Sequence, residues 1–353
     1  MEKLKIGIIG MGGIANYHIA RTMASEDAKV WAICDSNEQL LAIKGEEFNI
    51  PEERRFLNYE DMLKDADIDA VTIGTPNFNH FAVTYAAIRH RKPFALEKPI
   101  ALNVREAAIL RDALEEEYVP HMVCFTYRYK AAVRYAKWLI EQGKLGKIHH
   151  IYSQYFQGWA IHEEIPLTWR FQKELSGSGA LGDLGSHILD LHRFLVGETI
   201  KVAAHAGTIM NERNLMNEEG KGTVDVDDYC HVLAALEDGI SSTIAITRFA
   251  HGRGNYQRIE IYGTHGALVY DLEEEDELQV HFLEEDDKCF REVDIPSQFK
   301  VDQMQAFFHI LNGKADGLDA TIKDGYENQK TIDCIIEAFT DEKWVHIPKG
   351  HSQ

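Results

Sequence analysis

The sequence near the start of the chain reads Lys5-Ile-Gly-Ile-Ile-Gly-Met-Gly-Gly-Ile-Ala15, and this stretch decides the fold. Its isoleucines are β-branched and bounded by glycine, which predicts a short buried strand. Gly10, Gly12 and Gly13 then predict a turn with almost no side chain, and a helical pattern begins at Ile14. The first N–H groups of a helix that starts in this way are free, so a pyrophosphate can bind there.

The positions of the small residues fit this role individually. Gly10 permits a tight turn, Gly12 lets the backbone approach a phosphate, and Ala15 lets the helix pack closely on the strand. The next predicted strand, residues 30–34, ends at Asp35, twenty residues after Ala15. A carboxylate at this distance is suited to binding the hydroxyls of a ribose. We therefore predict that this part of the chain binds a dinucleotide.

The residues after Asp35 favour NAD over NADP. Ser36 and Asn37 follow, with no arginine beside them. A carboxylate repels a 2′-phosphate and accepts a hydrogen bond from a 2′-hydroxyl. Arg54 and Arg55 come later in the chain, and the sequence alone leaves open whether they fold back toward the ribose.

Composition limits the class of protein. A chain of 353 residues is long enough for two domains with separate cores. The net charge of −20 argues against a nucleic-acid partner, because phosphate backbones attract a basic surface. No segment approaches the roughly 20 apolar residues of a membrane span. The five cysteines lack CxxC spacing, so we expect free thiols and a cytoplasmic protein.

Strands and helices alternate up to about residue 123 and then change in texture. The alternation predicts a doubly wound parallel sheet, a Rossmann domain over residues 1–123. From residue 200 onward strands follow one another without crossover helices, which predicts a mainly antiparallel sheet. Residues 124–353 are therefore expected to form an α+β domain. The acidic runs at 273–277 and 284–287 are expected at hairpin tips rather than at a metal site.

Ligands of doubly wound sheets bind at the carboxyl ends of the strands. We expect the residues that follow predicted strands to lie along one such edge, namely the Gly10 turn, Asp35, Thr75, Lys98 and Tyr127-Arg128. Lys98 stands between Glu97 and Pro99, and the proline stiffens the loop that carries it. A desolvated lysine there can transfer protons near neutral pH, although a solvated surface lysine is the alternative.

Asp183 and His187 are four residues apart on a predicted helix, so they share one face. A carboxylate that orients an imidazole makes a proton acceptor for a hydroxyl that becomes a carbonyl. The alternatives are that Asp183 is only an N-cap and that His187 is a core histidine. Asp190 and His192 follow on the same segment, and we interpret them as structural.

Aromatic and hydrogen-bonding side chains precede this helix: Tyr155, Gln157, Trp159, His162, Trp169 and Arg170. Such a mixture suits a polyol, which has apolar C–H faces and polar edges. Ordinary sheet packing is the alternative for Tyr155 and Trp159. The chain has seventeen histidines, but no pair has ligand spacing with a third partner, so we expect no metal.

Together these motifs resemble those of the glucose–fructose oxidoreductase and inositol dehydrogenase family, abbreviated Gfo/Idh/MocA. The resemblance covers essentially the whole chain and rests on Gly10-x-Gly12-x-x-Ala15, Thr75-Pro-Asn-x-x-His80, Glu97-Lys98-Pro99, Tyr127-Arg128, Trp169-Arg170 and Gly179-Ala-Leu-Gly-Asp183-x-Gly-x-His187. The chain departs from the family at Thr126, where many members have asparagine, and at Lys130-Ala131, where a proline is usual nearby.

The resemblance implies that Lys98, Asp183 and His187 form a catalytic group beside the nicotinamide. It implies reversible oxidation of a secondary alcohol on a sugar or cyclitol. It also implies that the domain of residues 124–353 has an open sheet, binds the substrate and mediates oligomerisation into a homo-dimer or homo-tetramer. We expect His187 as the base, Asp183 as its orienting group and Lys98 as the electrostatic partner, with Lys98 as the alternative base. Two other functions stay open: an NAD-dependent glycosidase that oxidises its substrate transiently, and a non-enzymatic NAD-binding sensor.

The expected binding residues fall into two sets. The cofactor set is Gly10, Gly12, Gly13, Ile14, Asp35, Ser36, Thr75, Pro76, Asn77, His80, Glu97, Lys98 and Arg128. The substrate set is Lys98, Tyr127, Gln157, Trp159, Trp169, Arg170, Asp183 and His187.

Overall fold

The computed structural model describes residues 2–216, 218–273, 276–284 and 289–349. The chain divides into two compact units, and each is described by itself. The first contains the residues up to Phe125 together with Asp302–Glu327, and the second contains Thr126–Val301 and the residues from Asn328 onward. The segment Asp302–Glu327 returns to the first unit from late in the chain, whereas the expected first domain consists of residues 1–123 alone. It joins the first unit through its own contacts, since the Val123 N–H donates to the carbonyl of Ala320 over 2.8 Å.

The first unit is built on a six-stranded sheet of order β3-β2-β1-β4-β5-β6, in which every pair is parallel. Its strands are β1 (Leu4–Ile9), β2 (Ala28–Cys34), β3 (Arg55–Phe56), β4 (Ala70–Ile73), β5 (Phe94–Leu96) and β6 (His121–Val123). The strands β4 and β5 are buried along their whole length, as expected for a parallel sheet covered on both faces. This strand order is that of dinucleotide-binding domains, which confirms the predicted Rossmann fold.

The helices of the first unit differ in how their first turns are capped. They are α1 (Gly13–Ala24), α2 (Glu38–Glu47), α3 (Tyr59–Lys64), α4 (Asn77–Arg89), α5 (Val104–Glu116), α9 (Gln303–Leu311) and the start of α10 (Ile322–Thr340). In α2, α3, α5 and α9 an Asn or Asp side chain accepts a hydrogen bond from the first turn. The N-cap residues of α1 and α4 are Gly12 and Pro76, and neither makes such a side-chain bond.

The second unit is built on a nine-stranded sheet of order β16-β15-β14-β13-β7-β12-β11-β8-β17. Its strands are β7 (Ile148–Phe156), β8 (Thr199–Gly207), β11 (Tyr229–Leu236), β12 (Ser241–Thr247), β13 (Tyr256–Gly263), β14 (Gly266–Asp271), β15 (Glu277–Phe282), β16 (Arg291–Glu292) and β17 (Val345–His346). The pair β7–β12 is parallel and the others are antiparallel. The predicted α+β domain with a mainly antiparallel sheet is therefore confirmed.

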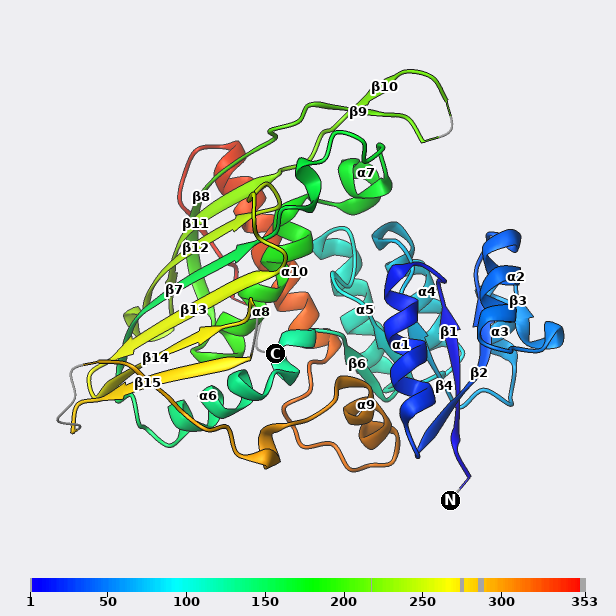
Figure 1. The fold of residues 1–353 in the computed structure, drawn as a ribbon, viewed down its shortest axis with the longest axis horizontal. Helices are drawn as coiled ribbons and strands as arrows, with labels where there is room; N and C mark the ends of the chain where they lie inside the picture. The colour runs from blue at the N-terminus through cyan, green and yellow to red at the C-terminus, as the bar shows by residue number, and fades with distance from the viewer. Residues whose placement is uncertain (1, 217, 274–275, 285–288, 350–353) are drawn as a thin grey trace. The chain divides into compact units, whose positions relative to one another are not determined.

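The two faces of this sheet differ in their cover. Helices α6 (Ala131–Glu141), α8 (Ser186–Leu195) and the later part of α10 lie on one face (Figure 1). Burial alternates along β7, β11 and β12, so every second side chain of these strands points away from that cover. Tyr152 and Leu233 lie on the outward side and are 46% and 53% exposed.

Local differences from the predicted elements are confined to short segments. Asp183 lies in a π-helical turn, Leu181–Gly185, which continues into α8, where a regular helix was expected. The helix α9 begins at Gln303, after a separate 3₁₀ turn over Ser297–Phe299. A hairpin of β9 (Glu212–Asn214) and β10 (Lys221–Thr223) was not predicted.

The two acidic runs include residues 274–275 and 285–287, which lie outside the described residues. Among the residues that the structure describes, no helix is both long and apolar enough to cross a membrane.

Candidate active site

The glycine turn of the first unit has the geometry that a pyrophosphate requires. Gly10 has φ +92°, and a Cβ there would lie 2.7 Å from the carbonyl oxygen of Gly74, so only glycine fits. Because Gly12 does not cap α1, no side chain occupies the N–H groups of its first turn. Gly13 begins the helix, and Ile14 is 38% exposed beside it. The turn and the helix start together fit the diphosphate of a dinucleotide.

Asp35 lies directly after β2, next to this turn. One carboxylate oxygen accepts the Met11 N–H and the other accepts the Asn37 N–H, each over 2.8 Å. These two bonds fix the carboxylate at the carboxyl end of the sheet, where a ribose would bind. Ser36 beside it is exposed.

The two arginines that the sequence left open have partners within the first unit. Arg55 donates to Glu46 and to the carbonyl of Ile50, over 2.8 and 2.7 Å. The Arg54 guanidinium lies 3.0 Å from the ring centroid of Trp31. The guanidinium groups of Arg54 and Arg55 thus contact groups other than Asp35.

His80 joins the loops that follow β4 and β5. Its Nδ1 lies 2.6 Å from the carbonyl oxygen of Pro99 and its Nε2 lies 2.8 Å from that of Thr75. The ring is buried, and burial lowers the pKa of His80. The predicted cofactor residue His80 therefore holds together the backbone of the two predicted binding loops.

The neighbouring predicted residues of these loops lie where their strands end. Pro76 occupies the N-cap position of α4 without a side-chain hydrogen bond, and the buried Asn77 is the first residue of that helix. Lys98 is half-buried and precedes a cis peptide bond to Pro99. The Glu97 carboxylate, in contrast, is turned into the unit, where it lies 3.1 Å from Nε2 of His18.

In the second unit, Asp227 fixes the start of the segment that carries Asp183 and His187. Its two carboxylate oxygens accept the N–H groups of Gly179 and Leu181, each over 2.7 Å. A Cβ on Gly179 would lie 1.9 Å from the Asp227 carbonyl oxygen, so the close approach requires glycine. Burial raises the pKa of the Asp227 carboxyl. Sequence reasoning missed Asp227, because it is distant in the chain and belongs to no motif.

This arrangement decides between two interpretations of Asp183. The π turn begins at Leu181 with Ala180 before it, and the N-cap of α8 is Gly185. Asp183 is therefore inside the turn and is not an N-cap. π turns of this kind occur often at functional sites.

His187 lies beside a partly buried network of hydroxyl and amide groups. Its ring centroid is 4.6 Å from that of Tyr127, in an edge-on arrangement. The Tyr127 and Tyr155 hydroxyls are 2.6 Å apart, and Tyr155 donates to Asn255 over 2.8 Å. Gln157 donates to the same Asn255 oxygen over 2.8 Å. The structure thus brings together His187 and two other predicted substrate residues, Tyr127 and Gln157, and adds Asn255, which no sequence motif indicated.

The polar residues interpreted as structural have buried partners. Asp190 receives two hydrogen bonds from Arg128, over 2.6 and 2.8 Å. His192 lies between the hydroxyls of Ser153 and Ser242, and burial lowers its pKa to about 3. Arg128, predicted to bind cofactor, thus has a structural contact inside the second unit.

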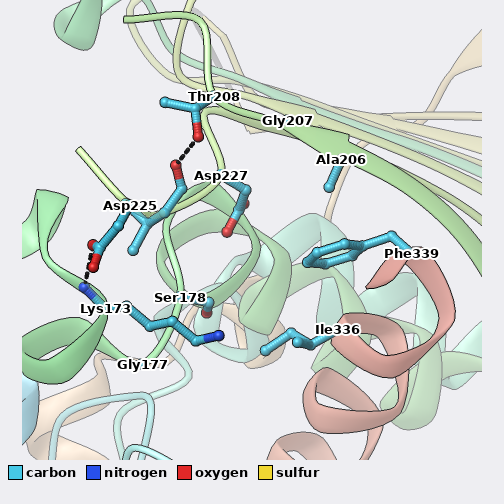
Figure 2. A pocket seen from close by; sticks show the side chains of 11 residues that line it. Lys173, Gly177, Ser178, Ala206, Gly207, Thr208, Asp225, Asp227, Ile336 and Phe339 are labelled. Atoms are coloured by element: carbon cyan, nitrogen blue, oxygen red, sulfur yellow. Dashed lines mark hydrogen bonds between the residues drawn. The ribbon is translucent and has the colours of Figure 1, made fainter. Parts of the chain in front are cut away.

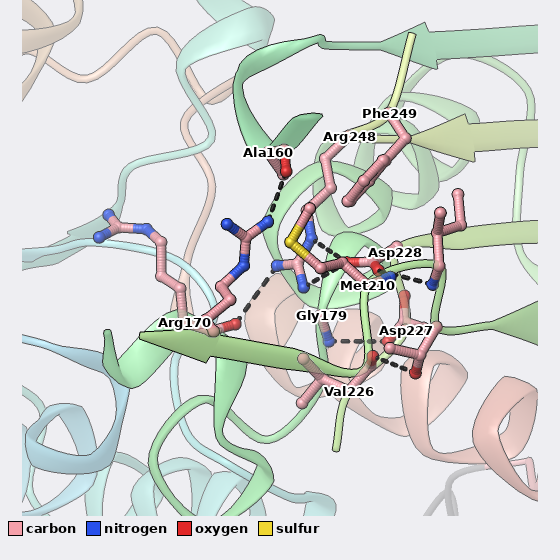
Figure 3. A network of polar contacts seen from close by, with 12 residues as sticks. Ala160, Arg170, Gly179, Met210, Val226, Asp227, Asp228, Arg248 and Phe249 are labelled. Atoms are coloured by element: carbon pink, nitrogen blue, oxygen red, sulfur yellow. Dashed lines mark hydrogen bonds and ion pairs between the residues drawn. The ribbon is translucent and has the colours of Figure 1, made fainter. Parts of the chain in front are cut away.

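The remaining predicted substrate residues lie on the segment 159–171, which two buried arginines hold in place. Figure 3 shows Arg248 paired with Asp228 over 2.8 Å and directed toward the carbonyl of Arg170, at 3.3 Å. Arg213 donates to the carbonyls of Ala160 and His162. The aromatic residues of this segment pack on their neighbours. The ring centroids of Trp159 and Phe171 are 5.7 Å apart, and the Arg170 guanidinium lies 4.3 Å from the ring centroid of Trp169.

Asp227 also lines a cavity of about 150 Å³ in the second unit. Figure 2 shows Lys173, Ser178, Asp227, Ile336 and Phe339 around it. None of the residues predicted to bind substrate lines this cavity.

Comparison with known proteins adds to this geometry. A family model described as an oxidoreductase family with an NAD-binding Rossmann fold matches residues 4–125. A model of the GFO/IDH/MocA C-terminal domain matches residues 133–269. A levoglucosan dehydrogenase of Pseudarthrobacter phenanthrenivorans is 33% identical over 99% of each chain. A glucose-6-phosphate 3-dehydrogenase of Bacillus subtilis is 31% identical over 69% of this chain and 67% of that protein.

A solved structure is similar to this chain over nearly its whole length. It is the structure of a levoglucosan dehydrogenase in complex with NADH and levoglucosan. Its TM-score is 0.89 and its identity 33%, over 99% of this chain and 100% of that chain.

Proposed function

The chain belongs to the GFO/IDH/MocA oxidoreductase family, and from this premise we propose that it transfers a hydride between NAD and a secondary alcohol of a sugar or cyclitol. The observation that carries the proposal is His187, which packs edge-on against Tyr127 next to a partly buried network of hydroxyl and amide groups. Such a network presents donors and acceptors to a polyol, and aromatic rings suit its C–H faces.

NAD, when bound, supplies the nicotinamide ring that accepts the hydride. The turn at Gly10 and the uncapped start of α1 are suited to its diphosphate, and Asp35 to its adenosine ribose. We propose NAD rather than NADP, because the fixed Asp35 carboxylate would repel a 2′-phosphate. Initial rates with the two cofactors test this preference, and a higher kcat/KM with NADP would contradict it.

The residues divide the proton chemistry among them. We propose that a ring nitrogen of His187 accepts the hydroxyl proton as the carbonyl forms, and that Asp183 orients that ring. The positive charge of Lys98 stabilises negative charge on the substrate oxygen. Support for these roles comes from the motifs that carry the three residues and from the π turn at Asp183.

The substrate class is tested by the compounds that drive cofactor reduction. The purified protein is incubated with NAD and a panel that contains levoglucosan, glucose 6-phosphate, myo-inositol and glucose. We expect net formation of NADH with at least one pyranose or cyclitol, followed by its absorbance at 340 nm. Cleavage of a glycoside without net NADH identifies a transient-oxidation glycosidase instead. NAD binding without either reaction identifies a sensor.

We further propose that the protein works as a homo-oligomer in the cytoplasm. The outward side of the second unit's sheet carries large apolar side chains, and all five cysteines are free. We predict that Leu233→Glu on this side lowers the mass measured by light scattering to that of one chain. Thr243→Glu at the opposed position of β12 is a second test of the same side, and Ile43→Glu on α2 is an exposed control. A wild-type protein that is already a monomer contradicts this proposal.

A further inference from the structure

The first unit contains a buried cluster of four side chains to which the proposed reaction gives no chemical role. His18 comes from α1, Glu97 follows β5, Cys124 follows β6, and Gln303 begins α9. Their exposed fractions are 0%, 8%, 0% and 1%. Imidazole, carboxylate, thiol and amide groups from four elements thus meet inside one core, and each can bind a metal ion.

The ligand atoms are close enough to share one ion. His18 Nε2 lies 3.1 Å from Glu97 Oε1, and these two atoms and Cys124 Sγ all lie within 4.8 Å of one another. Tetrahedral zinc with bonds of about 2.0–2.3 Å holds its ligands roughly 3.3–3.8 Å apart. The His18–Glu97 pair is already near this separation, and the sulfur needs to move by about 1.5 Å at most.

The hydrogen bond between His18 and Glu97 provides a polar partner for only two of the four side chains. The Gln303 side chain interacts with the Cys124 thiol, yet neither of its amide atoms has a well-formed hydrogen bond to nitrogen or oxygen among the described residues. The Nδ1 atom of His18 likewise has no hydrogen-bond partner among the described residues. A buried amide without a well-formed hydrogen bond costs about 1–3 kcal/mol, which a bound ion offsets by coordinating the Gln303 oxygen.

The charge and the ligand types select the class of ion. One thiolate and one carboxylate balance a divalent cation, so the complex is neutral and suits a buried position. Sulfur and imidazole ligands favour zinc-like ions over Mg²⁺ and Ca²⁺, which prefer oxygen. Four protein ligands leave no open position, which is typical of a structural site.

We propose that His18, Glu97 and Cys124, with Gln303 as the fourth ligand, bind a zinc-like divalent ion. The ion would link α1, α9 and the ends of β5 and β6 within the first unit. Because Glu97 directly precedes Lys98, the bound ion would also fix the segment after β5 that carries Lys98.

Cobalt is the probe that tests the site, because thiolate coordination to Co²⁺ produces a near-ultraviolet charge-transfer band. The full chain is stripped with a chelator and titrated with Co²⁺ and then with Zn²⁺. We expect one equivalent of Co²⁺ per chain, a thiolate band, displacement by Zn²⁺ and a higher melting temperature. A wild-type protein without the thiolate band overturns the proposal, whatever the variants do.

Matched cysteine variants locate the ligand. Cys124→Ser should lose the band and weaken Co²⁺ binding by at least about 100-fold, which exceeds the effect of changing a group behind a ligand. Cys34→Ser removes a second buried thiol of the same unit and should keep the band. Retention of the band in Cys124→Ser, or its loss in Cys34→Ser, overturns the assignment. If Cys124→Ser does not fold, Gln303→Leu takes its place and should weaken Co²⁺ binding while the band persists; unchanged affinity there counts against the fourth ligand. These measurements do not depend on turnover, so the dehydrogenase proposal is tested separately.

Discussion

Lys98 shows what a single side chain contributes to the proposed chemistry. We predict that Lys98→Met keeps NAD binding and lowers kcat by about 10²–10⁴-fold, because the positioned charge and proton donor are lost while the nucleotide loop is unchanged. NAD affinity is measured by fluorescence titration and kcat with the best substrate of the panel. Lys64→Met removes an exposed lysine of α3 and should behave as wild type. Near-normal turnover in Lys98→Met would rule out the assigned role.

Gly179 is the residue at which backbone packing controls the second unit. A methyl group there would lie 1.9 Å from the Asp227 carbonyl, so Gly179→Ala must move one of the two segments. We predict a loss of about 3 kcal/mol in the free energy of unfolding, at the upper end for overpacking, and weaker substrate binding. Gly254→Ala meets no atom within 4 Å and is the matched control. Equal urea midpoints for the two variants would contradict the prediction.

At this scale the sequence identified the residues that stand in local motifs. Gly10 and Asp35 follow strands whose pattern is visible in the sequence, and His187 belongs to a recognisable run. Asp227 and Asn255 were missed because they meet their partners only through the fold. Asp227 is 48 residues from Gly179, and no short-range spacing encodes such a pair.

Among the elements, the segment 159–171 depends on a buried ion pair. Arg248 and Asp228 are each 1% exposed and lie 2.8 Å apart. Removing one partner leaves an uncompensated buried charge, so we predict that Arg248→Met costs about 3–5 kcal/mol of stability and raises KM. The double variant Arg248→Met with Asp228→Asn should recover part of that loss in urea unfolding. A double variant less stable than Arg248→Met would contradict this account.

The predictability of the elements follows their regularity. The buried parallel strand β5 is a continuous apolar run, and the helix that follows it, α5, starts at an Asn103 side chain that caps its first turn. The π turn at Leu181–Gly185 is set by the hydrogen bonds of Asp227 to Gly179 and Leu181, which no local pattern expresses. The β9–β10 hairpin is too short to show a period.

For the molecule as a whole, buried histidines predict sensitivity to acid. The pKa of His192 falls from 6.5 to about 3 in the folded protein through burial. Between these values the unfolded chain binds a proton that the folded protein does not, so stability falls as the pH falls. This group alone removes about 2 kcal/mol between pH 7 and pH 5.

The variant His192→Gln isolates this effect. It keeps a polar group between Ser153 and Ser242 but cannot titrate. We predict that the stability difference between wild type and variant shrinks by about 2 kcal/mol from pH 7 to pH 5, measured by urea unfolding. His149→Gln changes an exposed histidine and should keep the wild-type slope. Parallel slopes for wild type and His192→Gln would contradict the prediction.

The overall architecture was predictable because each unit repeats a simple pattern, alternating strands and helices in one and successive strands in the other. The segment 302–327 was not, since a helix pattern such as that of α9 does not show which core it will join.

That returning segment has a consequence for biosynthesis. The carbonyl that receives the Val123 N–H belongs to Ala320, and α9 packs on α1 from almost three hundred residues further along the chain. A ribosome that has released only the first 125 residues has therefore not yet supplied the parts that finish the nucleotide-binding core. The nascent polypeptide must wait for nearly its full translation before that core can close, and an expression fragment cut after Phe125 would leave it permanently unfinished.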